Sequence, residues 1–242
     1  MDTSSSDSGE SGDPTTVSSE NTHSTDSDDV SILNEIRVKY AKNVVIAHLN
    51  INSLANKIDA LKLVIKDKID ILVLGETKLD DSFPEQQFFI EGYKKPYRLD
   101  RNSHGGGVMI YVRKDIPSRE LTKHNLPKNV EALFIEINLR KSKFLLGGTY
   151  HSKHPEYGTS DKTFFEQIGF TLDVYSNYDK FLLAGDFNVQ EGESSINDFL
   201  DEFGAKNLVK GNTCFKSSSN PSCIDLFLTN STVVIVSKNC YG

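Results

Sequence analysis

The first half of the chain contains two apolar segments of strand length separated by one amphipathic segment of helix length. Residues 43–51, NVVIAHLNI, and residues 69–76, IDILVLGE, are the two apolar segments. Residues 54–65 place aliphatic side chains on one helical face, with Ser53 as a candidate N-cap. Two strands joined by such a helix pair as parallel neighbours through a crossover. This unit favours folds in which helices cover a sheet.

Three strands in succession, without a helix between them, are predicted next. They are GGGVMIYV (105–112), EALFIEINL (131–139) and KFLLGGTY (143–150). The second alternates apolar and polar residues, which is typical of a strand with one buried face. The glycine run that opens the first leads into a strand and not a helix, so we interpret it as a tight turn. This part of the chain predicts a meander of antiparallel pairs.

Helices and strands alternate again in the last third. We expect a helix over 162–175, a strand over 180–188, a short helix over 196–203 and a strand over 224–230. Because the helices are amphipathic and the strands largely buried, two packed sheets with helices outside them are the economical architecture.

The N-terminal segment differs in composition from the rest. Residues 1–29 are rich in Ser, Thr and Asp and hold eight acidic residues without Lys or Arg, so the other 26 acidic residues nearly balance the 27 basic ones. Such a segment buries too little apolar surface to offset its chain entropy, and we expect it to be disordered. One domain is expected over 30–242, starting with a short helix over Val30–Tyr40 that Asp29 caps.

Targeting signals are not visible in the sequence. The acidic N-terminal segment resembles neither a secretory signal nor a mitochondrial presequence, and no apolar run reaches the length of a membrane span. Three cysteines without CxxC spacing indicate reduced thiols. We expect a nuclear or cytoplasmic protein that is not secreted and has no membrane partner.

Polar residues recur where the predicted strands begin or end. They are Asn50, Glu76, Tyr150, Asp186, Asn188 and Asp225. Taken singly, each could cap a turn or complete the core, but buried carboxylates usually pair or hold a metal, and carboxylate and amide oxygens suit Mg²⁺. The sequence contains no P-loop, HExxH or GxSxG motif. The set therefore favours metal-assisted attack of water on a phosphodiester.

Five motifs occur in a family-specific order: HLNINSL, LGETKL, RNSHGGGVMIYV, LLAGDFN and SCIDLFLTN. Over about residues 40–230 the chain resembles the apurinic-type endonuclease domain of non-LTR retrotransposons, in the endonuclease/exonuclease/phosphatase superfamily. The resemblance implies a DNase-I-like, four-layered α/β sandwich of two mixed sheets flanked by helices. It also implies an enzyme that uses Mg²⁺ (or Mn²⁺) to nick DNA and leaves a 3′-hydroxyl.

The resemblance assigns roles to the strand-end residues. Glu76 would be the main metal ligand and Asn50 a supporting one. Tyr150 would contact the scissile phosphate, Asp186 would orient or deprotonate the attacking water, and Asn188 would steady the phosphate.

Three further residues would contact DNA. Lys78 would lie beside the phosphate backbone, Arg101 belongs to a basic stretch interleaved with tyrosines, and His104 could reach a phosphate. The alternatives are a solvated charge for each cation and a turn histidine for His104. Because the folded part is nearly neutral, we expect a modest, salt-sensitive affinity for DNA from a monomer.

The match departs from the family after Asp225. That aspartate would belong to an acidic cluster that holds the histidine of a closing Ser-Asp-His, yet all six histidines precede residue 155. We expect a C-terminally truncated domain without its final strand, which STVVIVS (231–237) would partly replace. Losing one such group typically costs ~10²–10⁴ in rate.

Three functions therefore compete at this stage. The first is a DNA endonuclease, the second is a catalytically dead retroelement remnant that binds DNA or protein, and the third is a phosphatase of the same superfamily.

Overall fold

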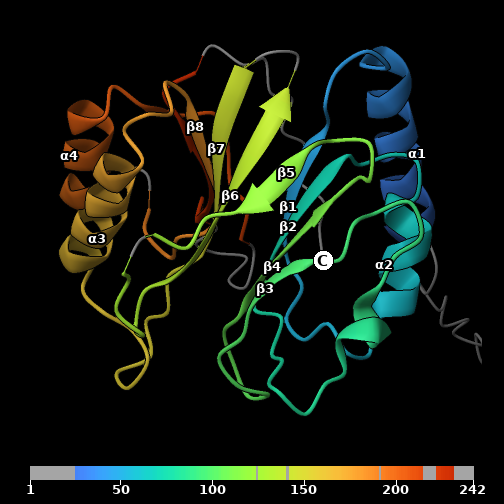
Figure 1. Ribbon diagram of the computed structural model, residues 1–242, viewed down its shortest axis with the longest axis horizontal. Coiled ribbons are helices and arrows are strands. Elements are labelled where there is room, and N and C mark those ends of the chain that lie inside the picture. The colour runs from blue at the N-terminus through green and yellow to red at the C-terminus, as the bar shows by residue number, and fades with distance from the viewer. Residues whose placement is uncertain (1–24, 124, 140–141, 191, 215–221, 232–242) are drawn as a thin grey trace, which may run out of the picture.

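Two β-sheets lie face to face between two pairs of helices in the computed structural model (Figure 1). It describes residues 25–123, 125–139, 142–190, 192–214 and 222–231. Helices α1 (Thr25–Lys39) and α2 (Ile58–Ile65) cover one side, and α3 (Asp161–Val174) and α4 (Ser194–Glu202) cover the other. The predicted four-layered sandwich is confirmed.

The first sheet has the strand order β1-β2-β4-β3. Its strands are β1 (Ile46–Asn50), β2 (Ile71–Gly75), β4 (Val108–Val112) and β3 (Tyr97–Leu99). Strands β1 and β2 are parallel and joined through α2, as predicted, whereas β4 is antiparallel to both of its neighbours. The parallel pairing brings the carboxyl ends of β1 and β2 to one edge of the sheet.

The second sheet has the order β5-β6-β7-β8-β10-β9. Its strands are β5 (Ser118–Glu120), β6 (Glu131–Leu139), β7 (Ser142–Tyr150), β8 (Phe181–Asp186), β10 (Asp225–Thr229) and β9 (Lys206–Asn207). Strands β7 and β8 are parallel and joined through α3, and the remaining pairs are antiparallel. Strands β3, β5 and β9 and the 3₁₀ turn η1 (Glu85–Phe88) are too short to show a periodic pattern, and the sequence did not predict them.

Apolar side chains fill the space between the sheets. Gly148 of β7 marks how closely the sheets approach, because a Cβ there would lie 3.0 Å from side-chain carbons of Val73 and Val108 and 3.2 Å from Ile110. On the outer face of the second sheet, α3 and α4 contribute an aromatic cluster in which Phe165 stacks on Phe187. The second sheet is therefore buried on both faces.

Burial on both faces corrects the expectation for β6. The alternating sequence predicted one exposed face, but the strand is buried from Glu131 through Ile137. Phe134 packs against Tyr175, and Glu136 accepts hydrogen bonds from Tyr178 Oη at 2.5 Å and Arg119 Nη2 at 2.9 Å. Glu136 is polar and still buried because these donors satisfy its carboxylate, which lowers its pKa to about 2, chiefly through Arg119.

Two predicted helix starts are also corrected. Helix α2 begins at Ile58, because Asn52 and Ser53 adopt positive φ values of 43° and 78°, and Ser53 uses its N–H on the Glu76 carbonyl instead of capping the helix. Helix α1 begins at Thr25, so Asp29 lies inside it and not at its cap.

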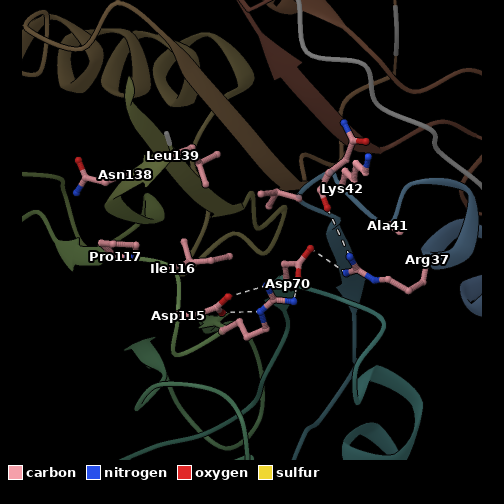
Figure 2. A pocket seen from close by; sticks show the side chains of 12 residues that line it. Arg37, Ala41, Lys42, Asp70, Asp115, Ile116, Pro117, Asn138 and Leu139 are labelled. Carbon is pink, nitrogen blue, oxygen red and sulfur yellow. Dashed lines mark hydrogen bonds and ion pairs between the residues drawn. The ribbon is translucent and has the colours of Figure 1, made fainter. Parts of the chain in front are cut away.

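A buried carboxylate, Asp70, joins three segments at the edge of the first sheet where β2 begins. Its Oδ2 accepts from Arg37 Nη2 at 2.8 Å and from the Val45 N–H at 2.7 Å, and its Oδ1 lies 2.5 Å from Arg113 Nη1. Figure 2 shows the contact between Arg37 and Asp70, which both line a pocket of about 510 Å³. Because carboxylates already neutralise both arginines, we interpret this pocket as structural.

We expect Asp70→Ala to lower the free energy of unfolding by about 2–4 kcal/mol, because it leaves Arg37 and a backbone N–H without their buried partner. Urea unfolding followed by circular dichroism measures the change. Asp115→Ala is the matched control, since Asp115 also pairs with Arg113 but its side chain is 63% exposed, and it should cost under about 1 kcal/mol. Equal losses in the two variants would contradict the structural role of Asp70.

Candidate active site

A row of polar side chains crosses one end of the second sheet. Tyr150 on β7 is paired with Glu131 on β6 and with Asp186 on β8, and Asp186 is paired with Asp225 on β10. Residues directly opposite one another share a face of the sheet. Gly148, two residues before Tyr150, faces the first sheet, so the whole row faces it too. The register thus joins three predicted residues and adds Glu131.

Asn50 connects this row to the first sheet. Its Nδ2 donates to Glu76 Oε1 at 3.0 Å and to Asp186 Oδ2 at 2.8 Å. Asn50 ends β1 and Glu76 directly follows β2, so the parallel pairing of those strands puts both at the edge that faces Asp186. One amide therefore holds two carboxylates that come from different sheets.

The segment that carries Glu76 has an unusual backbone. Glu76 and Lys78 have φ values of 51° and 52°, a region that costs of order 1–3 kcal/mol for residues other than glycine. Hydrogen bonds to the glycine run hold it, from Thr77 N to Gly107 O at 3.3 Å and from Lys78 N to Gly106 O at 2.9 Å. A Cβ on Gly107 would collide with Thr77. The glycine run leads into β4, as expected, and its lack of side chains lets the Glu76 segment approach.

Burial dominates the electrostatics of the row. Burial first and the negative charge of Asp225 second raise the pKa of Asp186 to about 7, against hydrogen bonds from Asn50 and the Asn188 N–H. Burial and the negative charges of Glu76 and Asp186 also raise the pKa of Tyr150, so its hydroxyl stays protonated. Asp186 can accept a proton near neutral pH, and Tyr150 can donate a hydrogen bond.

Asn188 makes hydrogen bonds next to this row through both its backbone and its side chain. Its N–H donates to Asp186 Oδ1 at 3.0 Å, and its Nδ2 donates to the His151 carbonyl at 3.0 Å. Its φ is 49°, which places a third residue of the site in the left-handed region. The structure therefore brings Asn188 to Asp186, with its side-chain amide donor already used within the protein.

His48 belongs to this cluster, and the sequence did not predict it. The ring is buried with Nδ1 3.4 Å from Asp225 Oδ1, and burial lowers its pKa while Asp225 opposes that effect. His48 precedes Asn50 by two residues on β1, so both side chains project from the same face. That spacing was the signal in the sequence. Only the tertiary structure shows that Asp225 of the other sheet lies opposite.

The three predicted DNA contacts occupy different environments. Lys78 Nζ lies 3.8 Å from Glu76 Oε2 and donates to Asn52 Oδ1, beside the site. Arg101 turns inward, where Nη1 bonds Glu131 at 2.7 Å and the guanidinium lies 4.9 Å from the centroid of the Tyr157 ring. His104 lies in an exposed turn. The structure thus brings Lys78 and Arg101 to the edges of the polar row.

The donor set suits a hard divalent cation. Glu76, Asn50 and Asp186 offer carboxylate and amide oxygens, and Mg²⁺ is usually held by one or two carboxylates with water and phosphate completing its shell. Within the described ranges, no group of three or more His, Cys, Asp or Glu side chains is placed to hold a metal ion by itself. These residues suit an ion whose remaining ligands are water and a phosphate.

A sequence model of the Endonuclease/Exonuclease/phosphatase family matches residues 47–241. The chain belongs to this family. Its two mixed sheets and four described helices form the family's DNase-I-like, phosphodiesterase-like fold, and the family is typically metal-dependent. The match begins just before the His48 and Asn50 positions and includes every predicted site residue.

Solved structures of diverse function share the fold. The endonuclease domain of TRAS1, a telomere-specific non-LTR retrotransposon, is 16% identical with a TM-score of 0.56, covering 76% of this chain and 82% of its own. The 3′ phosphatase NExo from Neisseria, bound to product DNA hairpin, is 19% identical with a TM-score of 0.55, covering 77% and 86%. A mannosyl-6-phosphatase from Bacteroides thetaiotaomicron is 13% identical with a TM-score of 0.54, covering 78% and 86%.

No curated relative matches the sequence. None of the helices in the described part of the chain is long and apolar enough to cross a membrane.

The raised pKa of Asp186 predicts a pH-dependent stability. The folded state keeps this proton above the unfolded pKa of about 3.9, so its stabilising contribution is lost as pH rises from about 4 to about 7. Without divalent ions, we expect Asp186→Asn to gain roughly 2–4 kcal/mol relative to the wild type across that range, because the amide does not ionise. Urea unfolding in EDTA at several pH values measures the difference. Parallel stability curves for the two proteins would contradict the raised pKa.

Proposed function

We propose that this protein is a Mg²⁺-dependent DNA endonuclease that hydrolyses a phosphodiester bond and leaves a 3′-hydroxyl. The observation that carries the proposal is the Asn50 amide, which joins Glu76 and Asp186 between the two sheets. It gathers oxygen donors, a group that accepts a proton near neutral pH and a neutral phenol at one edge of the fold. The shared fold of the TRAS1 endonuclease domain supports DNA as the substrate.

Glu76 and Asn50 would hold the ion in this proposal, and Asp186 would act on the attacking water. A bound divalent ion supplies neutralisation of the phosphate charge. Asp186 takes a proton from the attacking water, whose oxygen bonds to phosphorus as the bond to the 3′-oxygen breaks. The 3′-oxygen takes a proton from solvent, and the other product carries a 5′-phosphate. Tyr150 donates a hydrogen bond to the phosphate, and Asn188 fixes Asp186 through its N–H.

DNA would approach along the edge that Lys78 occupies. Lys78 is the predicted cation beside Glu76, and its side chain is 24% exposed, so its charge reaches solvent. Arg101 and His104 stay predicted contacts, although the pairing of Arg101 with Glu131 limits its reach. The near balance of charges outside residues 1–29 favours a modest affinity.

We expect the purified protein to nick supercoiled plasmid with Mg²⁺, and Glu76→Gln and Asp186→Asn each to lower the rate by ~10²–10⁴, because each removes a charge at the reacting phosphate. Gel conversion of supercoiled to open-circular DNA measures the rate. A DNA polymerase should extend the nick, which tests for the 3′-hydroxyl. Lys62→Ala is the control, because it changes a partly exposed lysine on α2 whose ion pair is with the exposed Asp59.

Different outcomes separate the competing functions. A folded wild type that binds DNA without nicking it would support a catalytically dead remnant. Phosphate release from a 3′-phosphorylated oligonucleotide or a sugar phosphate, without nicking, would support a phosphatase. Equal nicking by the wild type and both site variants would point to a contaminant and overturn the proposed site.

We expect Lys78→Ala to weaken DNA binding and to reduce the slope of log affinity against log salt by about one, since one phosphate contact is lost. Fluorescence anisotropy with a labelled duplex between low and moderate salt, in Ca²⁺ to limit cleavage, gives the slope. Lys62→Ala should leave it unchanged. An unaltered slope in Lys78→Ala would remove Lys78 from the interface.

A further inference from the structure

The buried contact between His48 and Asp225 involves neither the groups that would hold the ion nor those that act on the water and the phosphate. His48 comes from β1 of the first sheet and Asp225 from β10 of the second, so the contact bridges the two sheets next to the Asn50 bridge. The His48 side chain is 2% exposed and that of Asp225 is 24% exposed. A buried ring therefore faces a carboxylate that reaches the surface of the site.

The surroundings of the ring specify its tautomer. Within the part of the chain that the structure describes, His48 Nε2 is buried without a hydrogen-bond partner, and it faces Gly75, where a Cβ would lie 3.4 Å away. A proton on Nε2 would bury an N–H group without an acceptor, whereas a proton on Nδ1 lies on the side of the ring that faces Asp225 Oδ1, 3.4 Å away. The Nδ1–H tautomer is thus the one in which the ring can donate to the carboxylate once the contact shortens.

Asp225 is a strand neighbour of Asp186, the group that takes a proton in the proposed reaction. It lies directly opposite Asp186 in the strand register, and its backbone N–H donates to Thr213 Oγ1 at 3.0 Å. Its Oδ1 is buried, accepts no hydrogen bond from the described residues and lies 3.4 Å from His48 Nδ1. Hydrogen bonds at unliganded active sites are often long and tighten in the complex. His48 is the donor that Oδ1 lacks.

We propose that His48 is a positioning residue that donates from Nδ1 to Asp225 and holds this carboxylate against Asp186 during hydrolysis. The inference rests on the proposed function. In this arrangement β1 supplies an imidazole for Asp225 from the strand that also supplies Asn50.

A double-mutant cycle on the nicking rate tests the proposal. His48→Leu keeps a similar volume and removes the donor, and we expect it to lower kcat roughly 10–100-fold with little change in KM, as for a positioning group. In the Asp225→Ala background, the same change should cost nothing further. His48→Asn, whose amide nitrogen can take the place of Nδ1, should recover most of the rate.

Additive losses in the cycle, or full activity in His48→Leu, would overturn the proposal. Thermal melting of each variant shows whether the fold is retained. If His48→Leu does not fold, the other two variants still test the proposal. The proposal requires His48→Asn to be active and Asp225→Ala to be slow.

The tautomer can be measured without any activity. In protein labelled with ¹⁵N-histidine, long-range ¹H–¹⁵N correlation spectra should show His48 as the Nδ1–H tautomer, with the signal assigned by its loss in His48→Asn. Asp225→Ala should shift it and leave His151, whose ring nitrogens contact backbone carbonyls, unchanged. An Nε2–H tautomer whose His48 signal does not shift in Asp225→Ala would contradict the proposed contact. A wild type that shows the contact but does not cut DNA would instead overturn the proposed function.

Discussion

The site depends on one amide that donates two hydrogen bonds, from Asn50 to Glu76 and to Asp186. Those carboxylates belong to different sheets, and without a donor between them they would repel each other in a medium of low polarity. The side chain of Asn50 is short, so its double contact requires the two sheets to be close at this edge. The geometry of the site therefore requires the same close packing of the two sheets that forms the core.

Backbone strain around the site follows from the same requirement. Glu76, Lys78 and Asn188 all have positive φ values, and each directly follows a strand end or lies within three residues of one. A regular extension of β2 or β8 would carry the side chains along the sheet and away from the partner sheet. Turning the backbone aims them across the edge instead, and hydrogen bonds to Gly106 and Gly107 offset part of the cost at β2.

Sequence patterns predicted the elements well because their signals are local. The strand–helix–strand unit, the seven longest strands, and the strand ends at Asn50, Glu76 and Asp186 all follow from apolar runs and their polar termini. Glu131 was missed because only the β6–β7 register reveals that it faces Tyr150. His48 was missed because its partner lies in the other sheet. Strand β6 was predicted to be half-exposed because Glu136 is polar. The hydrogen bond from Tyr178, which lets Glu136 stay buried, comes from a residue far along the chain and is visible only in the folded structure.

Gly148 has no functional group, yet the site depends on its small size. It sits where β7 passes closest to Val73 and Val108, two residues before Tyr150 in the polar row. Any side chain there would act as a wedge between the sheets and lengthen the reach that Asn50 must span to Asp186. A mutational screen that measures activity alone would therefore find Gly148 as sensitive as the carboxylates. Only a measurement of the distance between the sheets would show that Gly148 acts through spacing and not through the chemistry.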